Sequence, residues 1–261
     1  MNIDKFTITS YDQITGFDRT NGSLDMILDE LTDFTLSQEE EKVDITGKGG
    51  RAIGSLKKNK KVTGSGTNGM LSGGALAAML GSEIEDGTHV IRYTDAIVVN
   101  SDKGSTSEEA IGTVGNEIGT IYVRDANKAY ISGGKKLTQT SSSPSTGEFS
   151  YNPSTKEITF FAGDVADGTE VIAFYDAEVT GKKITNDADS YSKTLQVFID
   201  VTCQDGCDNL FHGQFIVPRA DFNGTFDITG GSDPSTLGFE FTSQPDLCTG
   251  KSSLWDFIVF D

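Results

Sequence analysis

The C-terminal third of the chain alternates apolar and polar side chains in a strict two-residue period. In TLQVFIDVTC the apolar residues Leu195, Val197, Ile199 and Val201 are two positions apart. Successive side chains of a strand point to opposite sides, so these four are expected to lie on one buried face. This pattern indicates a half-buried β-strand and not a helix.

Further runs of the same kind follow. LFHGQFIVP continues the alternation, and Pro218 is expected to end it, since proline cannot donate to a strand ladder. Asn223 and Gly224 predict a hairpin turn between Phe222 and Phe226. LGFEF and LWDFIVF supply two more strands. With 30 glycines and no helix–strand alternation, the chain is predicted to be mainly β, an antiparallel sandwich or barrel with one or two short flanking helices.

Two N-terminal segments have helical features. In GSLDMILDELTDF, Leu24, Ile27, Leu28 and Leu31 have helical spacing, which favours a short helix, although alternation through Met26 supports a strand instead. LSGGALAAMLG predicts a helix over residues 71–80 that Gly81 ends in the left-handed conformation.

Between these segments, residues 33–47 are expected to form an extended polar strand or a strand pair around the charged stretch QEEEK. Residues 47–69 are rich in glycine and lysine and have few apolar anchors. They predict a long extended loop that leads into a strand.

The middle of the chain differs in character. Two stretches rich in serine, threonine and glycine enclose short β-like runs, and YNPSTKEITFF predicts a hairpin with Pro153 and Ser154 at its turn. We expect residues 1–100 and 181–261 to form the main β core. Residues 101–180 are expected to form a small inserted or elaborating β module.

The chain carries 39 acidic and 21 basic residues, a net charge of −18. A protein that binds nucleic acid by neutralising phosphates needs the opposite charge. The composition therefore argues against a protein that grips nucleic acid.

Motifs for catalysis or cofactor binding are weak. Gly64 to Gly69 match G-x-G-x-x-G, but a lysine-rich segment precedes them where a dinucleotide site needs a buried strand, so a glycine-rich strand or loop is the better interpretation. The cysteines, Cys203, Cys207 and Cys248, lack metal-site spacing and are expected to be free thiols in a reduced, cytosolic setting. No nucleophile–base pair is evident. We expect no enzyme, cofactor or metal, and no membrane span.

The lysine-rich stretch KKNKK is a basic segment in a chain whose net charge is negative. A basic segment is complementary to the acidic surface of other copies, and such complementarity helps to steer subunits together. The sequence therefore predicts an inter-subunit loop whose candidate residues are Arg51, Lys57, Lys58, Lys60 and Lys61.

Several long stretches resemble one group of proteins. TGKGGRAIGSLKKNKKVTGSGTNGMLSGGALAAMLGS resembles the N-terminal half of major tail (tail tube) proteins of long-tailed phages and prophages of Gram-positive bacteria. SKTLQVFIDVTCQDGCD, FIVPRADFNGTFDITGG and the final LWDFIVFD resemble the C-terminal half. The resemblance covers most of the chain and rests on structural motifs.

This resemblance implies a virion structural protein of the phage tail, assembled in the host cytoplasm. Such subunits form rings, usually hexameric, that stack into a tube with an acidic lumen through which DNA passes without specific binding. The implied partners are other copies of the chain and the tail terminator, baseplate or distal tail, and tape-measure proteins. The alternatives are a capsid decoration or baseplate protein, and then a surface carbohydrate-binding β module.

Overall fold

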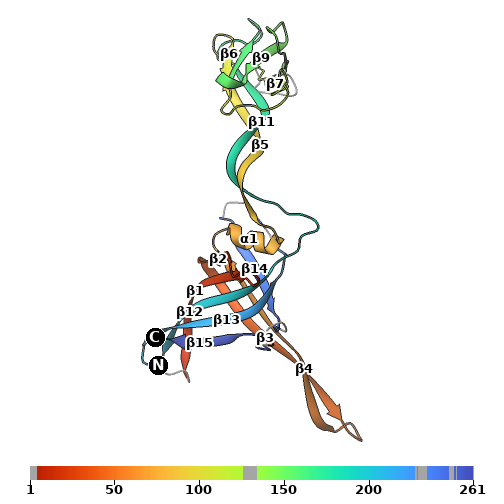
Figure 1. Cartoon of the computed structure of the whole chain (residues 1–261), viewed down its shortest axis with the longest axis vertical. Helices are drawn as coiled ribbons and strands as arrows, with labels where there is room; N and C mark the ends of the chain where they lie inside the picture. Colours follow the sequence, from red (N-terminus) through yellow and green to blue (C-terminus); the bar gives the residue numbers. More distant parts are fainter. Residues whose placement is uncertain are drawn as a thin grey trace. The chain divides into compact units, whose positions relative to one another are not determined.

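The computed structural model describes residues 5–125, 134–226, 228, 234–246, 250 and 252–260. The chain divides into two compact units (Figure 1). Unit 1 combines Met1–Glu85 with Ile184–Asp261, and unit 2 is Asp86–Lys183. The only helix longer than one turn in the described residues, α1 (Gly73–Leu80), has eight residues, and no described helix is long and apolar enough to cross a membrane.

Unit 1 is built on one curled sheet of eight strands (Figure 1). Its order is β2-β1-β12-β13-β14-β4-β3, and β15 pairs with β13 beside β14. All the pairs are antiparallel. The strands are β1 (Phe6–Asp18), β2 (Leu24–Leu28), β3 (Leu31–Thr46), β4 (Ala52–Asn68), β12 (Thr194–Asp205), β13 (Leu210–Phe222), β14 (Leu237–Ser243) and β15 (Asp256–Phe260).

The core of unit 1 lies on one face of this sheet. The predicted face of β12 is confirmed, because Leu195, Val197, Ile199 and Val201 are all buried. The helix α1 adds Ala75, Ala78 and Met79 to the same core, and its prediction is confirmed as well. The Ser72 hydroxyl caps the start of the helix by accepting a hydrogen bond from the Ala75 N–H. Gly81 ends the helix in the left-handed conformation, at φ +67°.

Residues 24–28 form the strand β2, so the preferred helix was wrong. Leu28 pairs with Ile14 of β1, and Met26 and Leu28 are buried while Leu24 and Ile27 are exposed. Burial at every second residue fits a strand. Pairing with β1 overrides a helical spacing that only a short segment supports.

Residues 52–68 form the strand β4, so the long loop expected over 47–69 was also wrong. Most residues of β4 pair with β3, apart from Ile53, Asn59 and Lys60 at two register shifts, and the inner half pairs with β14 as well. Gly64 and Gly66 lie opposite Phe241 and Phe239, whose rings occupy the space that a side chain at either position would need. The glycine-rich segment is therefore a strand.

Two details of the C-terminal third differ from expectation. Pro218 does not end its strand: β13 continues to Phe222, and the register shifts opposite Gln196, which is where a bulge accommodates proline. Asn223 and Gly224 do not form a tight hairpin either. β14 begins only at Leu237, so the connection is much longer than two residues.

Unit 2 has its own sheet of seven strands in the order β5-β11-β7-β8-β9-β10-β6. A separate core includes Phe149, Ile158, Val171 and Tyr175. The predicted hairpin is confirmed, with a single 3-10 turn, η1 (Pro153–Thr155), between β9 and β10. The strands are β5 (Ile84–Val98), β6 (Lys103–Ser105), β7 (Thr120–Val123), β8 (Lys136–Gln139), β9 (Glu148–Asn152), β10 (Glu157–Phe160) and β11 (Glu170–Ile184).

The boundaries of unit 2 differ from those set by composition. The division falls at 86 and 183, whereas composition placed it at 101 and 180. The reason is that β5 is one continuous strand and pairs with β11, so the residues before 101 belong with unit 2.

Candidate assembly surface

The hairpin of β3 and β4 extends beyond the rest of its sheet. β14 pairs with β4 only from Val62 onward, so residues 39–61 form a two-stranded ribbon, called the ribbon below. Its strand residues are exposed on both sides. A two-stranded hairpin without a third strand is only marginally stable in water. The ribbon therefore stands to gain stability from any surface that covers it.

A glycine turn closes the tip of the ribbon. Gly49 and Gly50 have φ values of +83° and +76°, and the N–H of Gly47 donates to the carbonyl of Arg51 at 2.8 Å. Glycine adopts such left-handed conformations at little cost. The GKGGR sequence thus reverses the chain within a few residues and places Arg51 at the tip.

One face of the ribbon is apolar. Val43 lies directly opposite Leu56, and Ile45 follows Val43 on the same side. Leu56 is 56% exposed and Ile45 is 51% exposed. Ile53, next to the turn, is 68% exposed. An apolar group of this kind on a projecting hairpin is typical of an interaction surface.

The opposite face of the ribbon is held by ion pairs. Lys57 lies 3.1 Å from Glu40, and Lys42 lies 3.7 Å from Asp44. Exposed pairs of this kind contribute roughly 0–1 kcal/mol each. This face is therefore charged and internally neutralised. The other face is apolar and uncovered at Val43, Ile45 and Leu56, and the Glu41–Lys58 ion pair borders it.

The five basic residues predicted as inter-subunit contacts all lie on the ribbon, in different settings. Lys57 and Lys58 already pair within the chain, with Glu40 and with Glu41 at 3.3 Å. Among the described residues, no ion pair engages Arg51, Lys60 or Lys61. The register shift at Asn59, whose φ is +54°, separates the paired lysines from the unpaired ones. The sequence indicated the basic residues and the alternation of Val43 and Ile45, but not the pairing that places Leu56 beside them.

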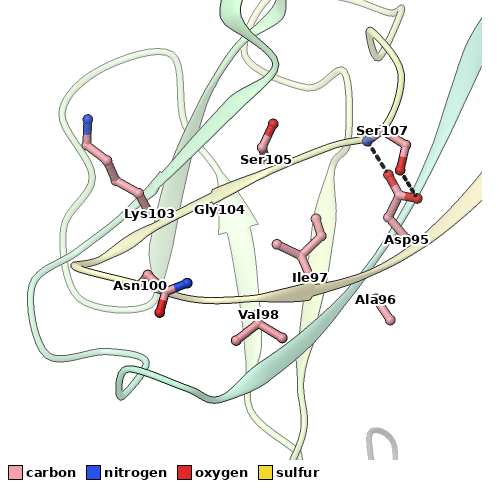
Figure 2. Close-up of a pocket in the computed structure, with 9 residues that line it drawn as sticks. All are labelled: Asp95, Ala96, Ile97, Val98, Asn100, Lys103, Gly104, Ser105 and Ser107. Carbon is pink, nitrogen blue, oxygen red and sulfur yellow. Dashed lines mark hydrogen bonds between the residues drawn. The ribbon is translucent and has the colours of Figure 1, made fainter.

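Unit 2 has an open depression of about 490 Å³ beside β5 and β6 (Figure 2). It is lined by Ile97, Val98, Asn100, Lys103 and Ser105, among others. The carboxylate of Asp95 at its rim accepts hydrogen bonds from the N–H and the hydroxyl of Ser107 at 2.7 and 2.9 Å. This acid is therefore used to fix the neighbouring segment.

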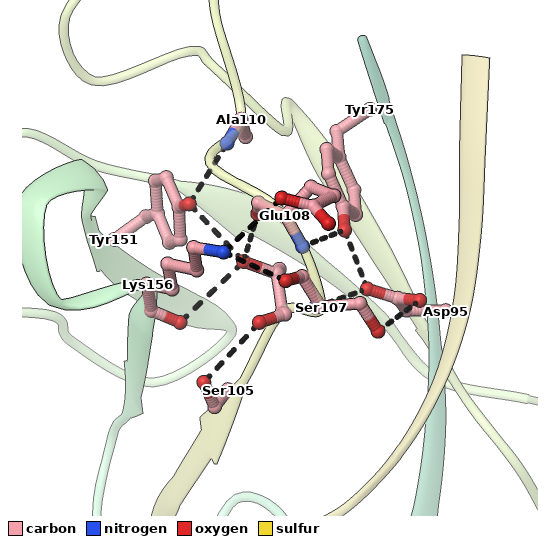
Figure 3. Close-up of polar contacts among 9 residues, drawn as sticks. Asp95, Ser105, Ser107, Glu108, Ala110, Tyr151, Lys156 and Tyr175 are labelled. Carbon is pink, nitrogen blue, oxygen red and sulfur yellow. Dashed lines mark hydrogen bonds and ion pairs between the residues drawn. The ribbon is translucent and has the colours of Figure 1, made fainter. Parts of the chain in front are cut away.

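A cluster of polar contacts continues from Asp95 (Figure 3). The Tyr175 hydroxyl donates to Asp95 at 2.5 Å and accepts from the Glu108 N–H at 3.0 Å. The Tyr151 hydroxyl accepts from the Ala110 N–H at 2.9 Å. Burial raises the pKa of the Tyr175 hydroxyl, and its bond to Asp95 raises this pKa further. The cluster holds the segment after β6 onto the core.

The cysteines show no metal-binding arrangement in the described part of the chain, which holds no group of three metal-ligating side chains. Cys203 is buried in the core of unit 1, and burial raises the pKa of its thiol. Cys207 is exposed, and Cys248 lies outside the described residues. A buried thiol with a raised pKa behaves as a small apolar side chain.

Two β units with separate cores, together with a projecting ribbon, define a mainly β protein. A sequence model of the YomU/Tube protein family matches residues 6–255. The chain therefore belongs to the YomU/Tube protein family and is a phage tube protein, a structural component of the virion tail. No curated protein sequence matches it.

Proposed function

We propose that this protein assembles with copies of itself into rings that stack to form the tail tube, through which the genome leaves the virion. The observation that carries the proposal is the uncovered apolar face of the ribbon, formed by Val43, Ile45, Ile53 and Leu56. Fully burying one such side chain contributes about 1.5–3 kcal/mol of favourable free energy. If association covered the exposed half of all four side chains, it would gain on the order of 3–6 kcal/mol per copy.

The charges of the ribbon favour a second copy of the chain as its partner. Arg51, Lys60 and Lys61 project from a protein whose net charge is −18. Opposite charges across an interface raise association rates and set its orientation. We therefore assign the ribbon to the contact between stacked rings.

The sheet of unit 1 also supports a conduit. On its side away from the core, β12 presents Gln196, Phe198, Asp200 and Thr202, and Asp12 of β1 accepts from the Thr202 hydroxyl at 2.7 Å. β1, β2, β12 and β15 contain no lysine or arginine, and β13, which lies between β12 and β15, contains only Arg219. A wall with so few cations makes few ion pairs with phosphates, so DNA passes it without being held.

The resemblance of the sequence supports the finer parts of the proposal. In these finer parts, the rings are hexameric, and the chain is the major tail protein of a long-tailed phage or prophage of Gram-positive bacteria. Its assembly takes place in the host cytoplasm. They also include contacts with tail terminator, baseplate or distal tail, and tape-measure proteins. The DNA is expected to pass through the lumen without specific binding.

A pair of matched triple variants tests the role of the ribbon. In the first, Val43, Ile45 and Leu56 are each replaced by Thr, which keeps strand propensity but removes the apolar face. In the control, Lys42, Asp44 and Ser55 on the other face are replaced by Thr. Circular dichroism reports folding, and negative-stain electron microscopy reports tubes.

We expect the first variant to fold and to yield no tubes or only single rings. The control is expected to form tubes, because its changes remove only one weak exposed ion pair, Lys42–Asp44. Normal tubes from the first variant would contradict the assignment of this face to ring stacking.

A further inference from the structure

The strands β1, β12, β13 and β15 form a four-stranded layer within the sheet of unit 1 (Figure 1). One row of cross-strand partners runs through Gln13, Asp200, Gln214 and Ile258. β15 therefore lies level with the middle of β1, at the opposite side of the layer. The two outer strands of this layer decide how it can be extended.

Two other strand edges of unit 1 are protected. β2 pairs with β1 only at residues 14–17, and its outer side meets the start of α1, where the Ser72 hydroxyl donates to the Ile27 carbonyl at 3.1 Å. The edge of β3 carries the charged stretch Glu39 to Lys42. A covering helix and charged side chains are the devices by which proteins prevent edge pairing.

In the described part of the chain, no helix covers the first half of β1 or β15, and each of these edges carries a single charged side chain, Asp12 or Asp256. Among the described residues, no strand pairs with the outer side of β1 over residues 6–13 or with the outer side of β15. Neither FTITSYDQ nor DFIVF contains lysine or proline. Exposed edges of this composition readily accept another strand.

The side chains along both edges are also compatible. Phe6, Ile8 and Tyr11 of β1 are partly buried on the core face, and so are Phe257 and Val259 of β15. If the two edges met, these residues would continue one apolar face across the joint and lose their remaining exposure. Burial of apolar side chains on one face is what fixes the register of a strand pair.

We propose that β15 of one copy pairs with residues 6–13 of β1 in the next copy. The inference rests on the proposed ring assembly and names its joint. Each step from β1 through β12 and β13 to β15 is antiparallel, so β15 and β1 run in opposite directions and the joint is antiparallel. Because the joint uses two different edges, it repeats head to tail and satisfies every such edge once the ring closes.

Engineered disulfides test the joint. The background carries Cys207→Ser and Cys248→Ser, and the buried Cys203 is kept. Ile258→Cys is combined with Thr7→Cys or with Thr9→Cys, because side chains on facing strands lie close enough for a disulfide. The matched control combines Ile258→Cys with Ile27→Cys on the covered β2 edge. Assembled full-length protein is oxidised and run on non-reducing gels.

We expect a ladder of covalent multimers from at least one β1 pair. Its yield should exceed that of the control pair roughly tenfold, since paired strands hold the thiols at high effective concentration. Tubes without a ladder would overturn the joint and leave the proposed function intact. Covalent dimers from Ile258→Cys alone would indicate pairing of like edges and would also overturn it. Absence of any assembly from the protein with its natural residues would instead remove the proposed function itself.

Charge on the edge supplies a second test that does not depend on disulfide geometry. Ile258→Lys should leave the circular dichroism spectrum unchanged, because Ile258 is 49% exposed, and should abolish rings. Ile27→Lys makes the same change at an exposed residue of β2 and should leave ring formation intact. Normal rings from Ile258→Lys would contradict the joint.

Discussion

At the scale of single residues, the inner half of β4 depends on glycine. A Cβ at Gly64 would lie 2.2 Å from the ring of Phe241, and one at Gly66 would lie 2.5 Å from the Asp33 carbonyl. Phe241 is fully buried, so its ring has little freedom to move. The glycines of GSGTNG thus make room for core phenylalanines, and no phosphate is needed to explain them.

Replacing Gly64 with Ala should therefore destabilise unit 1. We expect a loss of about 1–3 kcal/mol in the free energy of unfolding, because the added methyl forces Phe241 out of its position. Gly54→Ala on the ribbon is the control, since its nearest neighbour would be 3.9 Å away. Urea denaturation monitored by circular dichroism gives both values. Equal stability of the two variants would contradict the packing described here.

At the scale of elements, α1 is held by its ends. Gly81 has φ +67°, and a Cβ there would lie 1.8 Å from the carbonyl oxygen of Tyr191. The end of the helix therefore touches the segment before β12 at a point where only glycine fits. This contact fixes where the chain enters the central strands.

Gly81→Ala should lower the free energy of unfolding more than Gly22→Ala does, although the two glycines have similar φ values. Gly22 has φ +73° and open space around it, so alanine there carries only the left-handed penalty of roughly 1–2 kcal/mol. At Gly81 the backbone clash adds to that penalty. Thermal unfolding of the two variants measures the difference, and a smaller effect at Gly81 would contradict the account.

The strands with clear alternation were predictable from sequence, and segments whose partners lie far away were not. Leu195 to Val201 alternate strictly, and α1 carries its own cap at Gly81. The strand state of β2 depends instead on Ile14 and its neighbours, which local spacing does not show. The ribbon was misjudged for the same reason, since its lysines are compensated by glutamates across the hairpin.

For the candidate surface, the sequence indicated the basic residues of the ribbon but not its apolar face. The basic residues from Arg51 to Lys61 were visible as a cluster. The apolar face was not, because Val43 and Leu56 are brought together only by the register of β3 and β4. Surfaces built from both strands of a hairpin require that register to be known.

At the scale of the whole molecule, unit 2 is connected through two strand ends that lie close together. A Cβ at Gly73 would touch both Ile84 and Ile184, at 3.6 and 3.8 Å. The chain thus leaves unit 1 and returns to it at one place. Units with separate cores and adjacent connections can be removed without cutting either core.

Excision of residues 86–183, with an Asn-Gly turn joining Glu85 to Ile184, should leave unit 1 folded. The core around Ile199 and Phe241 contains no residue from the excised segment. Circular dichroism and a cooperative thermal transition are the measurements. A chain without a cooperative transition would show that unit 1 depends on unit 2.

Self-association through the ribbon and the open strand edges is the central claim, and cryo-electron microscopy of the purified full-length protein tests it most directly. We expect tubes of stacked rings in which the apolar face of each ribbon contacts a copy in the neighbouring ring. Protein that remains monomeric at high concentration, or tubes in which Val43, Ile45 and Leu56 stay exposed to solvent, would contradict it.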